Sequence, residues 1–265
     1  MKIAVIGSGN LATHLSLALK NSGNDIIQVF SRNIDNARCL ADKLACKAIS
    51  PDSSNSCEAI DNINKVSKDA EAYIIAVKDD AIRDVAEKLC HERPDAIFIH
   101  TAGSVTIDVF EGLAKRYGVL WPIQSLSKNA EVDFRKVPCC IEASDNETLE
   151  TIKKLAEGIT ETIRVVPSEK RKKIHLAAVF ANNLTNHCYR LAERITEAEE
   201  LDFSLLLPMI EETARKVTRM SPREAQTGPM VRYDQSVMSQ QLELIDDERT
   251  KAIYRLMAES IHADR

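Results

Sequence analysis

The sequence predicts an α/β fold, in which a doubly wound parallel sheet is followed by an all-helical C-terminal domain. Up to residue 167, short apolar runs alternate with amphipathic helical patterns, which is typical of a parallel sheet with helices on both faces. From residue 168 onward, strand-like alternation and glycine nearly disappear. We therefore expect one domain over residues 1–167 and a second, helical domain over residues 168–265.

The first strand is expected at residues 3–6, a short apolar run typical of a buried parallel strand. The motif G-x-G-x-x-A follows at residues 7–12 and opens a helical pattern, which is the Rossmann-like context for dinucleotide binding. Gly7 permits the tight turn, Gly9 lets a pyrophosphate approach the backbone, and free helix N–H groups face the phosphates. The alternative is an ordinary glycine turn. The expected cofactor-binding residues here are Gly7, Ser8, Gly9, Asn10 and Leu11.

The second strand, Asp25–Phe30, should indicate which dinucleotide binds. An NAD site usually places an acidic residue at the end of this strand, to hold the ribose 2′-hydroxyl. Here the strand runs into Ser31 and Arg32. A hydroxyl and a cation suit a 2′-phosphate, so we predict NADP(H) with Ser31 and Arg32 as its readers. The alternative is a solvated arginine in a loop.

Further short runs extend the predicted sheet. We expect strands at residues 48–50, 72–77, 96–100, 118–121, 138–143 and 162–166, a loop at 51–55, and helices at about 34–44, 81–90 and 146–157. Ligands of such sheets gather at the carboxyl ends of the strands. His100 lies there, either beside the nicotinamide or as a polar strand-end residue without chemistry. The residues predicted to line the nicotinamide half of the cofactor are Val77, Thr101, Ala102 and Gly103.

The segment after the strand at residues 118–121 carries neutral hydrogen-bonding side chains. Gln124 and Ser125 follow Trp121, the only tryptophan of the chain. We predict that Gln124 and Ser125 bind the substrate. A structural loop anchored by Trp121 is the alternative.

The helical domain is expected to contain helices at about residues 169–199, 203–219, 235–244 and 247–262, with Ser168 as the first N-cap. The basic run at residues 170–173 is interpreted as a solvated helix face, with an anion-attracting rim as the alternative. At 100° per residue, Asn182 would lie about 20° around the helix from His175. His175 could exchange the proton that accompanies hydride transfer, and Asn183 could orient a carbonyl or imine. A buried, structural histidine with hydrogen-bonded asparagines is equally open.

A second stretch of the helical domain carries further candidates. Ser221 and Pro222 should open a short helix. Thr227 and Arg232 are predicted to bind a substrate carboxylate or phosphate, with an interhelical turn as the alternative. Asp234 is expected to cap the next helix.

Composition excludes several classes of function. A net charge of −5 and a pI of about 5.8 speak against nucleic acid as a partner. No apolar run reaches the length of about 18 residues that a transmembrane helix needs. The seven cysteines contain no C-x-x-C pair, which predicts reduced thiols in the cytoplasm and no metal site.

Four motifs together resemble a bacterial family of NADP oxidoreductases with a Rossmann-like domain and a C-terminal helical domain of unknown function. These motifs are G-S-G-N-L-A-T-H-L, W-P-I-Q-S-L-S, H-L-A-A-V-F-A-N-N and T-G-P-M-V-R-Y-D. The family is similar in plan to pyrroline-5-carboxylate reductase, ketopantoate reductase, prephenate dehydrogenase and the deazaflavin-dependent NADP reductases. The resemblance implies an NADP-binding N-terminal domain and a helical domain that dimerises and closes the active-site cleft. It draws attention to His175, Asn183 and residues 227–234, although the family motif often has glycine where this chain has Tyr233.

The resulting hypothesis is a cytoplasmic, homodimeric NADP-dependent oxidoreductase. It would transfer a hydride between NADP(H) and a small, anionic carbonyl or imine compound. Two alternatives remain open: an NADP-binding, redox-sensing module without catalysis, and hydride transfer from NADPH to a deazaflavin.

Overall fold

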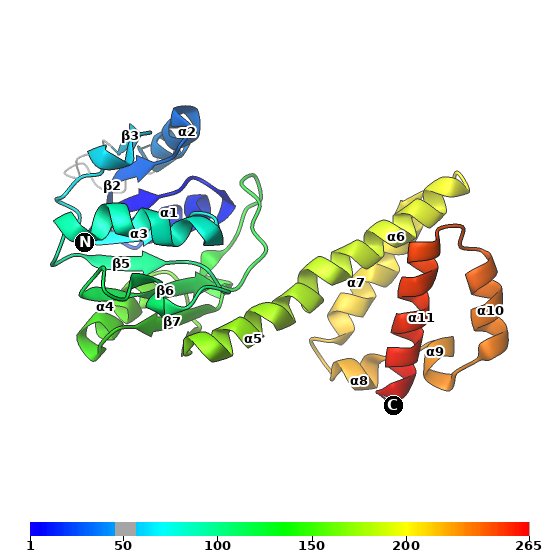
Figure 1. Ribbon diagram of the computed structural model, residues 1–265. Helices are drawn as coiled ribbons and strands as arrows, with labels where there is room; N and C mark the ends of the chain where they lie inside the picture. The colour runs from blue at the N-terminus through cyan, green and yellow to red at the C-terminus, as the bar shows by residue number, and fades with distance from the viewer. Residues whose placement is uncertain (46–56, 265) are drawn as a thin grey trace. The chain divides into compact units, whose positions relative to one another are not determined.

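The computed structural model describes residues 1–45 and 57–264 and divides into two compact units, Met1–Phe180 and Ala181–Arg265 (Figure 1). The first unit contains a sheet flanked by helices, and the second contains helices and turns. The predicted strand at residues 48–50 and the predicted loop at 51–55 lie outside the described residues.

Eight strands form the sheet of the first unit. They are β1 (Lys2–Ile6), β2 (Asp25–Phe30), β3 (Glu58–Ile60), β4 (Ala72–Ile75), β5 (Ile97–His100), β6 (Arg116–Pro122), β7 (Cys139–Ala143) and β8 (Ile163–Val165). Their order is β3-β2-β1-β4-β5-β6-β7-β8. The chain reverses direction across the sheet at β1, and such a switch point is where ligands bind in open α/β sheets. The predicted Rossmann-like α/β class is confirmed.

Two strands, β7 and β8, depart from the predicted parallel arrangement, because they run parallel to each other and opposite to the other strands. β7 runs antiparallel to β6, with Gly118 opposite Ala143 and Pro122 opposite Cys139. The connection between β6 and β7 contains only a short 3-10 turn, Phe134–Lys136, and no crossover helix. Two adjacent parallel strands that follow each other in the chain need a crossover connection between them, whereas two antiparallel strands do not.

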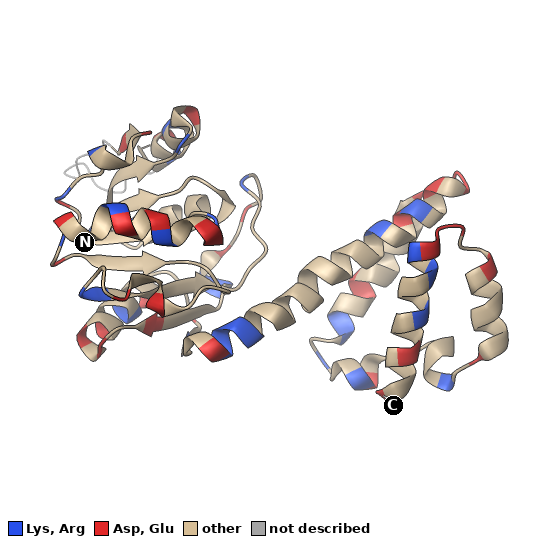
Figure 2. Cartoon of the chain, in the orientation of Figure 1, with Lys and Arg blue, Asp and Glu red and all other residues tan. Residues whose placement is uncertain are grey.

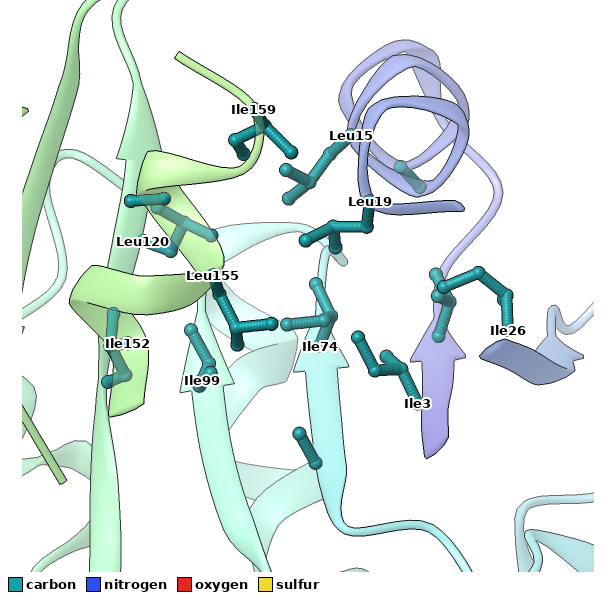
Figure 3. Close-up of a cluster of buried hydrophobic side chains, with 14 of the residues drawn as sticks. Ile3, Leu15, Leu19, Ile26, Ile74, Ile99, Leu120, Ile152, Leu155 and Ile159 are labelled. Atoms are coloured by element: carbon teal, nitrogen blue, oxygen red, sulfur yellow. The ribbon is translucent and has the colours of Figure 1, made fainter. Parts of the chain in front are cut away.

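Helices cover both faces of the sheet. α1 (Asn10–Asn21), α2 (Ile34–Ala45) and α4 (Asn146–Glu157) pack on one face, and α3 (Ile82–Leu89) packs on the other. Alternate strand residues point to opposite faces, so Ile74 joins the first layer and Ile75 the second. Figure 3 shows the first layer, in which Leu15 and Leu19 of α1 approach strand residues such as Ile3 and Ile74. This packing fixes the start of α1 at the carboxyl end of β1.

The last helix of the first unit, α5 (Ser168–Ala178), was predicted to begin with Ser168 as its N-cap. The N-cap is instead Pro167, and Ser168 is the first helical residue. The hydroxyl of Ser168 donates to Glu142 and accepts from the N–H of Ile107, so it joins α5 to the sheet instead of capping the helix. The division into units falls after Phe180 rather than at residue 167 because α5 packs on the sheet.

The second unit begins within a π-helical turn, Val179–Leu184, and continues through α6 (Thr185–Ala198). The remaining helices are α7 (Leu207–Lys216), α8 (Pro222–Ala225), α9 (Pro229–Arg232), α10 (Gln235–Glu243) and α11 (Glu248–Ala263). Two local predictions are confirmed: Ser221 opens α8 in a capping box with Glu224, and the Asp234 carboxylate caps α10 by accepting from Val237.

Two findings concern the described residues as a whole. None of their helices combines the length and the apolar character that a membrane crossing requires. The six cysteines among them are all unpaired, and burial raises the pKa of Cys57, Cys90 and Cys139 to about 12.

Candidate functional site

The first turn of the glycine motif depends on Gly7. Its φ of +126° is a conformation that other residues rarely adopt, and its N–H donates to the carbonyl oxygen of Phe30 at 2.8 Å. A Cβ at this position would collide with the backbone carbonyl of Ala76, whose carbon would lie 2.7 Å away. Gly7 therefore lets the ends of β1, β2 and β4 meet.

Gly9 leaves the start of α1 open. It is the N-cap of α1, and no side chain caps the first helical turn. A Cβ on Gly9 would meet nothing within 4 Å, so the space before the helix is free. The N–H groups of a first helical turn have no intrahelical partners, and together with the helix dipole they suit an anion. This geometry is therefore compatible with the prediction that the segment from Gly7 to Leu11 binds a pyrophosphate.

The end of β2 provides polar groups beside the glycine motif. The hydroxyl of Ser8 donates to that of Ser31 at 2.9 Å. Arg32 is exposed and has no ion pair with any residue that the structure describes, whereas Arg38 pairs with Asp35 at 3.5 Å. Asn33 caps α2 by accepting from the N–H of Asp35. The end of β2 thus offers a free cation and a hydroxyl.

The carboxyl ends of β4 and β5 lie beside the glycine motif in the sheet. Val77 is half-buried, whereas Thr101, Ala102 and Gly103 are buried. Thr101 donates to the carbonyl oxygen of Ile75 at 3.5 Å. Of these four residues, Val77 borders the motif, since a Cβ on Gly7 would lie 3.4 Å from its backbone nitrogen.

His100 proves to be structural. It is completely buried, its Nδ1 accepts from the N–H of Ala102 at 3.2 Å, and its ring packs on Phe110. Burial, with Arg171 nearby, lowers the pKa of His100 to about 3, so the ring is neutral at ordinary pH. A residue without exposed surface cannot line the nicotinamide.

Figure 2 marks the basic run at residues 170–173 in blue near the start of α5. This run is only partly a solvated face. Lys170 and Lys173 are exposed, but Arg171 is completely buried and forms an ion pair with Glu142 of β7. Arg171 also donates to Ser168 at 3.1 Å and to the carbonyl oxygen of Val105. The prediction of a solvated face is therefore wrong for Arg171. Helical spacing could have indicated that Arg171 is buried. Arg171 lies three residues before Ile174, so both are on one helix face, and Ile174 packs on the apolar cluster of β6 and β7.

His175 lies on α5 against the end of the sheet. Its ring is in tilted contact with Trp121 of β6, at 5.8 Å between centroids and 51° between planes. A Cβ on Gly103 would lie 2.6 Å from Cδ2 of His175. The structure therefore brings three predicted residues together: Gly103, Trp121 and His175.

The loop after β6 lies against the start of α1. The side-chain amide of Asn10 donates to the carbonyl oxygen of Leu126 at 2.7 Å, and His14 Nε2 lies 2.8 Å from that of Ser127. Gln124 and Ser125 are exposed in the same loop. The predicted substrate residues of this loop thus lie near the glycine motif, a link that sequence spacing alone did not indicate.

The other predicted residues belong to the second unit. Asn182 and Asn183 are exposed within the π-helical turn, so the estimate of 100° per residue does not apply to them. Thr227, which precedes α9, and Arg232, its last residue, are both exposed. Tyr233 adopts the left-handed conformation, with φ and ψ of 55° and 46°, that a glycine would take there. Tyr233 thus takes a backbone conformation that favours glycine, at the position where the family motif often has glycine.

A mostly parallel sheet with an open, uncapped helix start after its first strand is the arrangement of dinucleotide-binding α/β proteins. Residues 2–104 match the family model described as "NADP oxidoreductase coenzyme F420-dependent". Residues 137–261 match a domain of unknown function, DUF2520. No curated protein is similar enough in sequence to count as a match.

Solved structures agree with these assignments. A "putative NADP oxidoreductase" of Bacteroides fragilis is 40% identical, with a TM-score of 0.90 over 99% of this chain and 98% of that one. A Thermotoga maritima protein is 24% identical, with a TM-score of 0.72 over 99% and 97%. An imine reductase of Myxococcus stipitatus, solved with NADP⁺, is 15% identical, with a TM-score of 0.61 over 99% and 92%, and shares the fold. The chain belongs to the NADP oxidoreductase family represented by the Bacteroides fragilis protein, and NADP is the cofactor of that family.

Proposed function

We propose that this protein transfers a hydride between NADP(H) and a small, anionic carbonyl or imine compound. The observation that carries the proposal is the open start of α1 beside the Ser8–Ser31 pair and Arg32, which forms no ion pair with any described residue. An imine as substrate is supported by the fold shared with the imine reductase. Unpaired cysteines support a cytoplasmic location.

The residues take the following roles in this proposal. Backbone N–H groups from Gly7 to Leu11 hold the pyrophosphate, and Arg32 with Ser31 holds the 2′-phosphate. Val77 and Thr101 to Gly103 border the nicotinamide. When bound, NADPH supplies the hydride. His175 gives a proton to the carbonyl oxygen or imine nitrogen as the hydride reaches carbon, so the substrate gains two electrons and two hydrogens. Gln124 and Ser125 are the candidate substrate-binding groups of the first unit. Asn183, Thr227 and Arg232 are the candidates of the second unit, each considered by itself.

Titration with NADPH and NADH tests the cofactor assignment. We expect NADPH to bind more tightly than NADH. Arg32→Ala should weaken NADPH binding roughly ten- to a hundredfold, because a charge-assisted hydrogen bond to phosphate is lost, and should leave NADH binding unchanged. Arg38→Ala is the matched control, since Arg38 is exposed and already paired with Asp35. If Arg32→Ala keeps the full preference for NADPH, the assignment of Arg32 is wrong, and if neither nucleotide binds, the proposed function fails.

A deazaflavin is the second hydride acceptor to test, because the family model at residues 2–104 is described as F420-dependent. NADPH oxidation should be followed with a deazaflavin and with a panel of cyclic imines and 2-keto acids. Turnover with the deazaflavin alone would replace the proposed substrate class. NADPH binding without turnover in any assay would favour a redox-sensing module.

We also propose that the second unit forms a homodimer. Its only buried side chains among the described residues are Ile245, Thr250 and Ala258. Apolar side chains that a soluble domain ordinarily covers are exposed across it: Leu201, Leu205, Met209, Val217, Leu244, Leu256 and Met257. A unit of this kind needs a second surface to bury its apolar area, and a second copy of the chain satisfies the need symmetrically.

Sedimentation equilibrium tests the dimer. The expected mass is twice the 29.5 kDa of one chain. Leu205→Asp combined with Leu256→Glu should shift the mass to that of one chain, because charge is then buried in the interface. Lys115→Glu, on the exposed surface of the first unit, should leave the dimer intact. A single-chain mass for the unaltered protein at micromolar concentration would exclude this assembly.

A further inference from the structure

Three groups from different elements meet at the end of β6. Trp121 is buried in β6 on the face that α5 covers, with Val119, Cys140 and Ile174. A Cβ at Gly103 would lie 2.6 Å from Cδ2 of His175, and 2.7 and 2.8 Å from Cε2 and Cζ2 of Trp121. The imidazole and the indole therefore both lie against the backbone of Gly103. Any side chain at residue 103 would displace one of the two rings.

The anchor of α5 is separate from this contact. Arg171, one helical turn before His175, forms the ion pair with Glu142, and Ser168 forms two hydrogen bonds to the same carboxylate. These bonds hold the start of α5 whether or not the indole is present. The contact with Trp121 and Gly103 is thus not needed to place the helix, and it acts on the ring of His175.

We propose that Trp121, packed over the backbone of Gly103, is the positioning residue for the His175 imidazole. The proposal rests on the proposed function, in which His175 is the proton donor. A proton donor acts only within hydrogen-bond reach of the reacting atom, and a misplacement of 1 Å can cost about a hundredfold in rate. The indole restricts the tilt of the imidazole, because the two rings are in contact.

The surroundings of the contact allow it to be measured. The charged groups on α5 are Arg171, paired with Glu142 of β7, and Lys172, paired with Glu169. Burial raises the pKa of Cys140 of β7, and it lowers the pKa of His100 of β5 to about 3.

Tryptophan emission reports the contact without any substrate, since Trp121 is the only tryptophan. Contact with an imidazole quenches indole emission. We expect the emission of the unaltered full chain to be weaker than that of His175→Gln and of Gly103→Ala, which lose the contact. The control His91→Gln should match the unaltered protein, because His91 is exposed on a short turn after α3. Equal emission from the unaltered protein and from His175→Gln overturns the contact.

Turnover tests the positioning role. Trp121→Leu should lower kcat roughly ten- to a hundredfold and change its pH profile, while the KM for NADPH stays within about twofold. Trp121→Phe should retain most of kcat, because it keeps an aromatic face. Thermal unfolding of each variant identifies any loss caused by misfolding. If Trp121→Leu keeps full kcat and pH profile, Trp121 is only a core residue.

The two proposals fail in different ways. If the unaltered protein binds no NADPH, the proposed function falls, while the difference in emission between the unaltered protein and His175→Gln still reports the ring contact. If NADPH binds and is turned over but this difference in emission is absent, only the positioning role of Trp121 is overturned.

Discussion

Replacement of Arg171 by methionine is expected to lower the free energy of unfolding by about 3–5 kcal/mol. The Arg171 side chain has no exposed surface, and the Glu142 side chain is only 16% exposed. Removal of the guanidinium leaves this carboxylate largely buried without its counter-ion. It also leaves the carbonyl oxygen of Val105 without its donor. Chemical denaturation followed by the emission of Trp121 measures the loss.

Two further variants distinguish the loss of the buried ion pair from the loss of any positive charge on α5. Lys172→Met removes an exposed cation whose partner, Glu169, is 81% exposed, and should change stability by less than about 0.5 kcal/mol. Arg171→Met combined with Glu142→Leu should recover much of the loss, because no unpaired charge then stays buried. A loss below about 1 kcal/mol in Arg171→Met would show that water or another group compensates Glu142.

Arg171 also shows where prediction from the sequence ends. The sequence places it in a run of four cations, and an arginine in such a run is usually solvated. Its partner Glu142 is 29 residues earlier, on a strand that pairs antiparallel with its neighbour. Neither the pairing of β7 nor the approach of α5 is encoded in local spacing, so the ion pair depends on tertiary structure.

Local patterns, by contrast, predicted the sheet and the glycine motif well. The strand at residues 3–6, the turn at Gly7 and the helix after Gly9 are adjacent in the chain, so one stretch of sequence specifies all three. The caps at Ser221 and Asp234 are equally local. The π-helical turn at Val179–Leu184 was missed, because its composition does not differ from that of an α-helix. The expectation that His175 and Asn182 share one helix face assumed regular α-helical spacing, which this turn interrupts.

Gly7→Ala is expected to lower the free energy of unfolding by about 3 kcal/mol and to abolish NADPH binding. The methyl group would enter the space of the Ala76 carbonyl, and the φ of +126° is strained for alanine. The carboxyl ends of β1 and β4 would have to separate, and the start of α1 would move with β1. Denaturation and NADPH titration of the same sample measure both effects.

Substitutions at two other glycines separate the contributions to the effect of Gly7→Ala, namely the cost in backbone conformation and the loss of NADPH binding. Gly23 has a φ of +91° but open space around it, so Gly23→Ala isolates the conformational cost, about 1 kcal/mol. Gly9 has a φ of −73° and open space, so Gly9→Ala should fold normally. Its methyl group would nevertheless stand where a pyrophosphate must approach the backbone, and NADPH affinity should fall at least tenfold. If Gly9→Ala binds NADPH as tightly as the unaltered protein, the phosphates do not approach the start of α1, and the loop is only the turn that Gly7 makes possible.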